Sequence, residues 1–172
     1  METLATLLDI RWLAELVNDY DWVWPICEML HFIGMALLIG TVGWLDLRIL
    51  GFGKAVPIAS LEKLIPVGIV GFALNLSSGL IFVTGNIAGG PIAYLGNLAF
   101  QIKMLLILIA GLNLFAYYFM GIARAAEGVP ALGDAAPAAK AVAVVSLLCW
   151  FGVIYFGRLI MYNDTLLYSL GM

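Results

Sequence analysis

Charged side chains are scarce in this chain. Of its 172 residues, 11% are charged and 64% are hydrophobic, and the mean hydropathy is +1.07. An ordinary soluble domain is about half apolar and about a quarter charged. A soluble fold cannot bury so much apolar surface, so the composition excludes a soluble globular protein.

Several functional classes lack their sequence signals. Lys and Arg are scattered singly and the formal net charge is −3, so no basic stripe exists to bind a nucleic acid. No internal repeat supports an inverted-repeat transporter. No Ser/His/Asp or Cys/His arrangement, phosphate-binding glycine loop or paired catalytic carboxylates can be assembled. We therefore expect no nucleic-acid partner and no enzyme acting alone.

Cysteine and histidine are also rare. Cys27 and Cys149 are the two cysteines, and they lie in apolar segments at different expected depths, so we expect no disulfide between them. His31 is the one histidine. The N-terminus carries Glu2 and Asp9 in place of the basic start of a signal peptide. We expect it to be retained in the mature protein.

The chain does contain long apolar segments, each near the ~20 residues that a membrane helix needs. The predicted spans are residues 22–45, 67–83, 97–122 and 138–161. Residues 3–18 have the period of an amphipathic helix lying on the membrane surface, whereas 85–96 and 127–137 are predicted to be connections. The fold class is therefore all-α: one transmembrane domain over residues 1–172, a four-helix bundle with an N-terminal interfacial helix.

The cations indicate an orientation in the membrane. One face of the predicted bundle collects Arg48, Lys54, Lys63, Arg124 and Lys140. The other face has Arg11 and the partly embedded Lys103 and Arg158. By the positive-inside rule, we expect a multi-pass protein of the bacterial inner membrane with both termini on the periplasmic side.

Ionisable residues within the spans are the candidate site. Such residues cost a few kcal/mol each on insertion scales and mark either a site or a paired structural contact. Glu28, His31, Lys103 and Arg158 all fall in the outer half of the predicted bundle, and Asn97 enters the same layer. Glu28 and His31 also share a helix face. The simplest arrangement is one polar layer built from all four helices.

Two segments resemble a known family. The first is the run from His31 through Gly34 and Gly40 to Asp46-Leu47-Arg48, and the second runs from Asn97 to Lys103. Together they resemble a family of small bacterial inner-membrane proteins. That family is distantly similar to the membrane domain of copper-resistance D-type proteins and to b-type cytochrome helices. The resemblance implies a redox or metal-linked role.

The leading interpretation of the polar layer is a haem site. His31 would be an axial ligand of haem b, because imidazole is a common haem ligand and a bundle core can hold the macrocycle. Gly34, one turn later, would leave room for it, and Lys103 and Arg158 would pair with its propionates. The protein would then be a membrane subunit with a haem-linked or quinone-linked electron-transfer role.

Three alternatives remain open. Glu28 and His31 would pair with Lys103 and Arg158 in a buried ionic network, which makes the protein a non-catalytic structural or assembly component. Cys27, Glu28 and His31 would hold a metal ion, although a copper or zinc site needs more soft or imidazole ligands. Lastly, Glu28 and His31 would form part of a proton path.

Other residues are assigned structural roles. Asp46 and Arg48 are interpreted as a charged helix end at the cytoplasmic surface, with partner docking as the alternative. Tyr117 and its aromatic neighbours are assigned to the interfacial belt and helix packing. The small pairs Ala36/Gly40 and Ala139/Ala143 predict self-association or a membrane complex. The other partner is the lipid bilayer.

Overall fold

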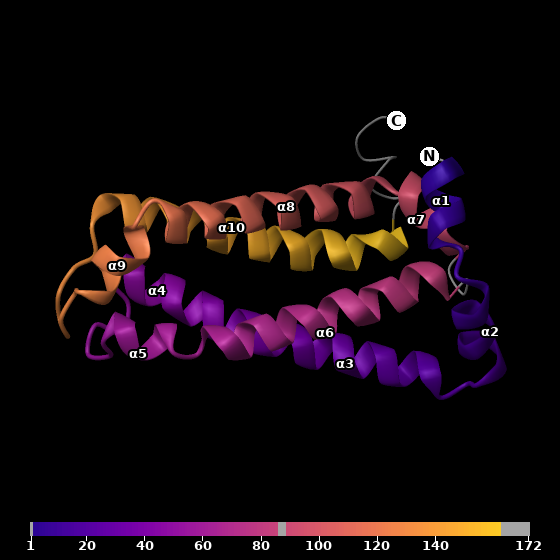
Figure 1. The fold of residues 1–172 in the computed structure, drawn as a ribbon, viewed down its shortest axis with the longest axis horizontal. Helices are drawn as coiled ribbons and strands as arrows, with labels where there is room; N and C mark the ends of the chain where they lie inside the picture. Colours follow the sequence, from indigo (N-terminus) through magenta and orange to yellow (C-terminus); the bar gives the residue numbers. More distant parts are fainter. Residues whose placement is uncertain (1, 86–88, 163–172) are drawn as a thin grey trace. The chain divides into compact units, whose positions relative to one another are not determined.

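Four helices of the chain are long and apolar enough to cross a membrane. The structure, a computed structural model, describes residues 2–85 and 89–162, and these form helices and short connections (Figure 1). The candidate spans are Val23–Leu50, Ile58–Thr84, Leu98–Phe119 and Pro137–Tyr162. Between 11% and 28% of the most apolar window of each is buried inside the chain, which leaves the rest for lipid. The all-α fold is confirmed, and the chain is a small polytopic membrane protein.

The helices have the following bounds in chain order. They are α1 Glu2–Leu8, α2 Arg11–Asp19, α3 Val23–Leu38, the π-helix η1 Ile39–Gly43, α4 Trp44–Leu50, α5 Ile58–Glu62, α6 Ile65–Thr84, α7 Gly90–Gly96, α8 Leu98–Phe119, α9 Ile122–Glu127, α10 Pro137–Leu159 and the 3₁₀ turn η2 Ile160–Tyr162.

The first span runs farther than the sequence predicts. The predicted end near residue 45 treats Asp46 and Arg48 as the return to water, whereas the helix continues to Leu50. It stops at Gly51, whose φ of 108° is a left-handed conformation that glycine adopts without strain. The N–H groups of Gly51 and Phe52 close the helix on the carbonyls of Arg48 and Leu47. Asp46 and Arg48 are therefore helical residues.

Three shorter segments also differ from expectation. The predicted loop 85–96 contains α7, since Gly89 and Gly90 turn the chain with positive φ and Pro91 begins the helix. The third span ends at Phe119, and a turn at Gly121 starts a separate helix, α9. The predicted surface helix 3–18 is divided into α1 and α2. The sequence also predicts a short amphipathic tail after the fourth span, and that segment lies outside the described residues.

The chain divides into two compact units, each built from parts of all four long helices. Unit 1 comprises the described parts of residues 1–36, 71–103 and 155–172, and unit 2 comprises residues 37–70 and 104–154. Each unit has its own core. Every predicted site residue of the outer polar layer belongs to unit 1, whereas Asp46 and Arg48 belong to unit 2.

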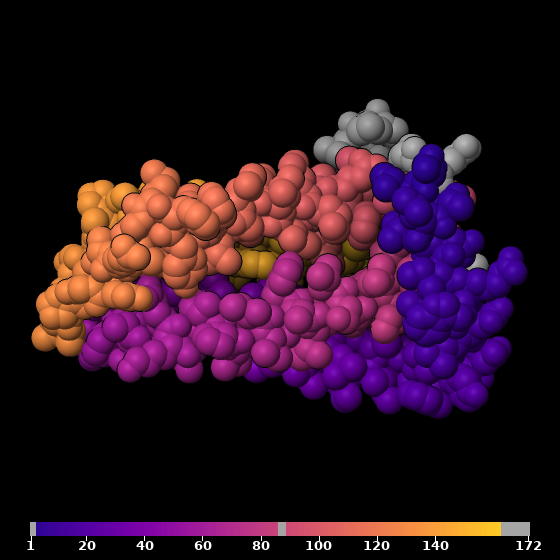
Figure 2. Space-filling model, in the orientation of Figure 1, coloured from indigo at the N-terminus to yellow at the C-terminus, as the bar shows by residue number. Residues whose placement is uncertain are grey.

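In unit 1, α1 and α2 run across the ends of α3, α6 and α7 (Figures 1 and 2). Val17 of α2 packs with Val23 and Cys27 of α3 and with Phe82 of α6. Leu4 and Trp12 keep 58% and 67% of their surface exposed, so the outer side of these helices is apolar. That side is available to a membrane surface, as the periodicity of residues 3–18 predicts.

In unit 2, the core is formed by α4, α5 and α9 with the C-terminal end of α8 and the N-terminal end of α10. Its buried members are Leu45, Ile49, Ile58, Leu61, Tyr117, Ala123, Ala126, Ala135, Ala139 and Ala143. Small alanines on α9 and α10 let these helices approach closely. Ala139 and Ala143 are only 1% and 0% exposed, so this pair serves packing within the chain and is not open to a second copy.

Helix α3 packs on α6 at Gly34. A Cβ atom at this position would lie 2.7 Å from the carbonyl oxygen of Gly71 and 2.9 Å from Asn75 Nδ2. We expect Gly34→Ala to lower the free energy of unfolding by about 1 to 3 kcal/mol, because the new methyl group forces the two backbones apart. The matched control is Gly111→Ala in α8, where a Cβ atom meets nothing within 4 Å. Denaturation in mild detergent measures both. Equal stability of the two variants would contradict this close approach.

Candidate functional site

His31 lies between α3 and α6 in unit 1. Its Nδ1 is 2.8 Å from Ser78 Oγ, and its ring is 5.2 Å from the ring of Phe82. Lys103 of α8 is near enough to interact with it electrostatically. The structure therefore brings His31 and Lys103 into one region, as the sequence predicts.

The hydrogen bonds of Ser78 indicate which ring nitrogen of His31 carries the hydrogen. A serine hydroxyl has one hydrogen to donate, and Ser78 Oγ lies 2.6 Å from the carbonyl oxygen of Leu74, one turn earlier in α6. Ser78 therefore accepts from His31, and Nδ1 carries the hydrogen. In the neutral imidazole this assignment leaves the lone pair on Nε2, which is the arrangement found in histidines that bind metals.

Gly34 does not supply the space expected for a macrocycle. The backbone of α6 fills the position beside it, so this glycine serves helix contact. Among the described residues, no group of three His, Cys, Asp or Glu side chains is placed to hold a metal ion. Cys27 and Glu28 thus do not complete a metal site with His31. Haem binding stays a prediction that depends on His31 and not on Gly34.

The other predicted residues of this layer have separate roles. Glu28 is exposed and accepts a hydrogen bond from Trp24 Nε1 at 3.1 Å. Lys103 lies against Gly157 of α10, and Arg158 is exposed with its guanidinium 5.9 Å from the ring centre of Tyr162. Asn97 caps α8 by accepting from the N–H of Phe100, and it donates to the carbonyl of Ile160.

The ion pairs of the predicted structural network do not form. Within residues 2–85 and 89–162, the salt bridges are those of Lys54 and Lys140 with Asp134, and all three residues belong to unit 2. Glu28 is therefore not paired with Lys103 or Arg158 in the described structure. The contacts of Glu28 and His31 also do not link into a continuous polar chain that could serve as a proton path.

A second polar region lies in unit 2, where two oppositely charged residues of α4 are buried. Asp46 is 5% exposed and Arg48 is 1% exposed. Both residues lie in the last turns of a helix, as interpreted, but neither returns to water there, because Arg48 is covered by the loops after α4 and after α9 and Asp46 is buried as well. Residues two apart on a helix point to different sides, so the two charges do not face each other.

Arg48 binds backbone carbonyls. Its Nε donates to the carbonyl oxygen of Val56 at 2.6 Å, and its terminal nitrogens donate to the carbonyls of Pro130 and Gly133 at 3.3 to 3.4 Å. Outside this contact, Lys54 Nζ lies 2.8 Å from Asp134 Oδ1. Lys54 and then Lys140 hold the pKa of the exposed Asp134 below its ordinary value. These interactions attach the loop before α10 to the end of α4.

Asp46 has no such set of donors. Ser146 on α10 is near its carboxyl group. One oxygen of the group, Oδ2, is buried and has no hydrogen-bond partner among the described residues. Tyr117 of α8 is near enough to interact with Asp46 electrostatically. A buried carboxyl group with an unpaired oxygen calls for a functional explanation.

Tyr117 connects this region to two further carboxyl groups. Its hydroxyl donates to Glu62 Oε1 at 2.6 Å. Glu62, on α5, is half-buried, and its carboxyl group is in hydrogen-bonding reach of the exposed Glu127 at the end of α9. Tyr117 is 4% exposed and belongs to the core of unit 2, so of its two assigned roles it serves helix packing and not the interfacial belt. Unit 2 thus contains a polar cluster in addition to the polar layer that the sequence predicts from residues of unit 1.

Little in the sequence points to this cluster. Its residues are 46, 62, 117, 127 and 146, and no periodicity relates five different helices. The one local signal is that Asp46 and Arg48 immediately follow an uninterrupted apolar run, a position at which an intramembrane charge marks a site.

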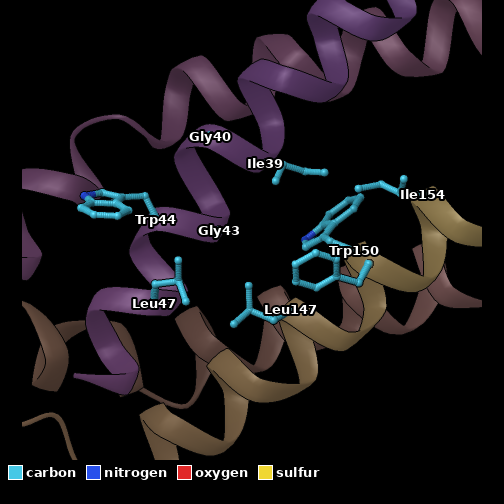
Figure 3. Close-up of a pocket in the computed structure, with 9 residues that line it drawn as sticks. Ile39, Gly40, Gly43, Trp44, Leu47, Leu147, Trp150 and Ile154 are labelled. Carbon is cyan, nitrogen blue, oxygen red and sulfur yellow. The ribbon is translucent and has the colours of Figure 1, made fainter. Parts of the chain in front are cut away.

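Unit 2 also has an apolar groove of about 210 Å³ beside η1 (Figure 3). Ile39, Gly40, Gly43, Trp44 and Leu47 line one side, and Leu147, Trp150, Phe151 and Ile154 of α10 line the other. This lining lacks charged side chains and suits a hydrocarbon chain better than a polar headgroup. A quinone-linked role therefore gains no charged contact from it.

Comparison of the chain with protein-family models, curated proteins and solved structures gives no match. The resemblance to small bacterial inner-membrane proteins thus stays a prediction, and the argument for function depends on the two polar regions.

The Arg48 contacts predict a selective loss of stability. Arg48→Lys should lower the free energy of unfolding by about 2 kcal/mol, because an ammonium group cannot reach Val56 and the loop carbonyls together. Arg124→Lys, at an exposed position of α9, is the matched control and should change stability by about 0.5 kcal/mol or less. Chemical unfolding in mild detergent compares them. A similar small effect of both would show that Arg48 does not hold the loop.

Proposed function

We propose that the protein is a small membrane subunit that takes up and releases a proton at Asp46. The observation that supports this is the carboxyl group itself, which is 5% exposed on a membrane-spanning helix and has an oxygen without a partner among the described residues. Ionisable groups in such positions are by default functional. Burying such a group destabilises the protein, so its presence indicates that it has a chemical role.

The surroundings of Asp46 favour a proton over a metal ion. An ionised carboxylate buried without a cation is expensive, and it becomes neutral by binding a proton. Arg48, two residues farther along the same helix, already donates to three carbonyl groups. A hard metal ion takes about six oxygen ligands. The neighbouring Ser146 and Tyr117 fall well short of that number.

The proposal includes an orientation in the bacterial inner membrane. Arg48, Lys54, Lys63, Arg124 and Lys140 all belong to unit 2, whereas Arg11, Lys103 and Arg158 belong to unit 1. The positive-inside rule then puts unit 2 toward the cytoplasm and both termini toward the periplasm. A reporter fused to either terminus that is active only in the cytoplasm should be silent. An active reporter would contradict the proposed orientation.

Self-association is the remaining part of the proposal. With Ala139 and Ala143 buried, the exposed small residues Ala36 and Gly40 are the ones open to a second helix. They would support a homo-oligomer or a larger membrane complex. A strictly monomeric mass in mild detergent, without a co-purifying partner, would contradict this.

Infrared spectroscopy tests the proton site. The spectrum of the acidic form minus that of the alkaline form should contain the carbonyl band of a protonated carboxyl group shielded from water. Asp46→Asn should remove this band, because an amide cannot bind the proton. The control Glu15→Gln changes an exposed carboxyl group in unit 1 and should leave the band in place. An Asp46→Asn spectrum that keeps the band would overturn the proposal.

A second candidate function is axial ligation of haem b by His31. The hydrogen bond from Nδ1 to Ser78 favours it, because ligating histidines usually donate their other ring nitrogen to a fixed partner. Lys103, close to His31, would hold a propionate. Because α6 packs at Gly34, a macrocycle bound at Nε2 would lie away from that glycine.

A visible absorption spectrum decides this second candidate. Purified protein with haem should show a Soret band that shifts on reduction, and His31→Ala should lose it while still inserting, because the apolar spans remain. The control Glu28→Gln should keep the band, since Glu28 contacts Trp24 and not the imidazole. A colourless preparation of the wild-type protein would exclude haem binding.

A further inference from the structure

We propose that Glu127, Glu62 and Tyr117 form the route by which a proton passes between water and Asp46. The inference rests on the proposed function of Asp46 and specifies which residues supply its proton. All four residues belong to unit 2, and they come from α9, α5, α8 and α4.

The route begins at a pair of carboxyl groups. Helices α5 and α9 pack together through Ile58, Leu61, Ala123 and Ala126, and this contact brings Glu62 and the exposed Glu127 into hydrogen-bonding reach. Two ionised carboxylates can only accept hydrogen bonds. Two carboxyl groups this close can form a hydrogen bond only when they share a proton, and the exposed member can exchange that proton with water.

Tyr117 extends the route inward. Its hydroxyl is buried, donates to Glu62 at 2.6 Å and lies in electrostatic range of Asp46. A phenol can donate and accept at the same time, so it can pass on a proton without holding a charge. The unpaired Oδ2 of Asp46 is the independent observation that gives the route an end point. Without it, the carboxyl pair would be only an acidic cluster.

The transfer balances in protons and charge. Glu127 takes a proton from hydronium and gives it to Glu62. The Tyr117 hydroxyl, which donates to Glu62 in the described structure, first turns toward Asp46. Glu62 then gives a proton to the oxygen of Tyr117, while Tyr117 releases its own hydroxyl proton to Oδ2 of Asp46, with water bridging any gap between them. Asp46 ends with one added proton, and the other groups return to their starting states. The reverse sequence releases the proton.

The cations of unit 2 do not form salt bridges with the carboxyl groups of the route in the described structure. Lys63 directly follows α5 and Arg124 lies on α9. Both side chains are exposed, and neither forms a salt bridge with Glu62 or Glu127 in the described structure. Lys54 and Lys140 bind Asp134, and Arg48 binds backbone carbonyls. Tyr118 is in electrostatic range of both glutamates but is 44% exposed, and Ser146 faces Asp46 from α10. No cation thus substitutes for the proton.

Hydrogen exchange at Asp46 tests the route. Full-length protein is moved from H₂O to D₂O at a pH where the Asp46 carboxyl band is present, and the rate at which that band shifts is followed by infrared spectroscopy. Tyr117→Phe, Glu62→Gln and Glu127→Gln should each slow the shift by roughly tenfold or more, since each removes a group that relays the proton. Glu127→Gln is at an exposed position, so it gives a result even if a buried variant fails to fold.

The control is Tyr118→Phe, which removes a neighbouring phenol that has no hydrogen bond to Glu62 in the described structure. Its exchange rate should equal that of the wild-type protein. Unchanged rates in all three route variants, with the Asp46 band still present, would overturn the route and leave the proton site intact. A wild-type protein without the Asp46 band would overturn the proton site and the route together.

Discussion

The structure of unit 2 depends on how the guanidinium group of Arg48 is satisfied. A charged group at the end of a membrane helix needs partners inside the protein, because the hydrocarbon offers none. Arg48 finds them in the carbonyls of Val56, Pro130 and Gly133, which belong to two separate loops. These hydrogen bonds convert both loops into a cover over the end of α4. The exposed pair of Lys54 and Asp134 adds to the same attachment, but surface pairs contribute little.

The enclosure of Asp46 follows from that cover. Asp46 and Arg48 are two positions apart, so once Arg48 turns toward the loops, Asp46 turns toward α8 and α10, where Tyr117 and Ser146 lie. The π-helix Ile39–Gly43 just before α4 contributes to this orientation, because its wider turn rotates every later residue relative to α3. Two opposite charges are therefore buried close together along one helix without being each other's partner. Backbone oxygens satisfy one, and in our account a proton satisfies the other.

The sequence was sufficient for the spans and insufficient for the site. Apolar runs near 20 residues predict membrane helices whatever their neighbours, so the four spans were found within a few residues except at Leu50, where the first ends, and at Ile58, where the second begins. Local glycine and proline content concealed α7. The predicted site failed where it assumed ion pairs, since Glu28 bonds to Trp24 while Lys103 lies beside Gly157. The contact of Glu62 with Tyr117 spans 55 residues, and it depends on the packing of α5 against α9, which no periodicity encodes.

The central claim is that Asp46 and Arg48 are satisfied separately, and a double-mutant cycle on the free energy of unfolding tests it most directly. The cycle needs Asp46→Asn, Arg48→Lys and the double variant in one mild detergent. Our account predicts that the two losses add, with a coupling energy below about 0.5 kcal/mol. A coupling energy on the order of 2 kcal/mol would mean that the carboxylate and the guanidinium stabilise each other as an ion pair, and it would contradict a proton at Asp46.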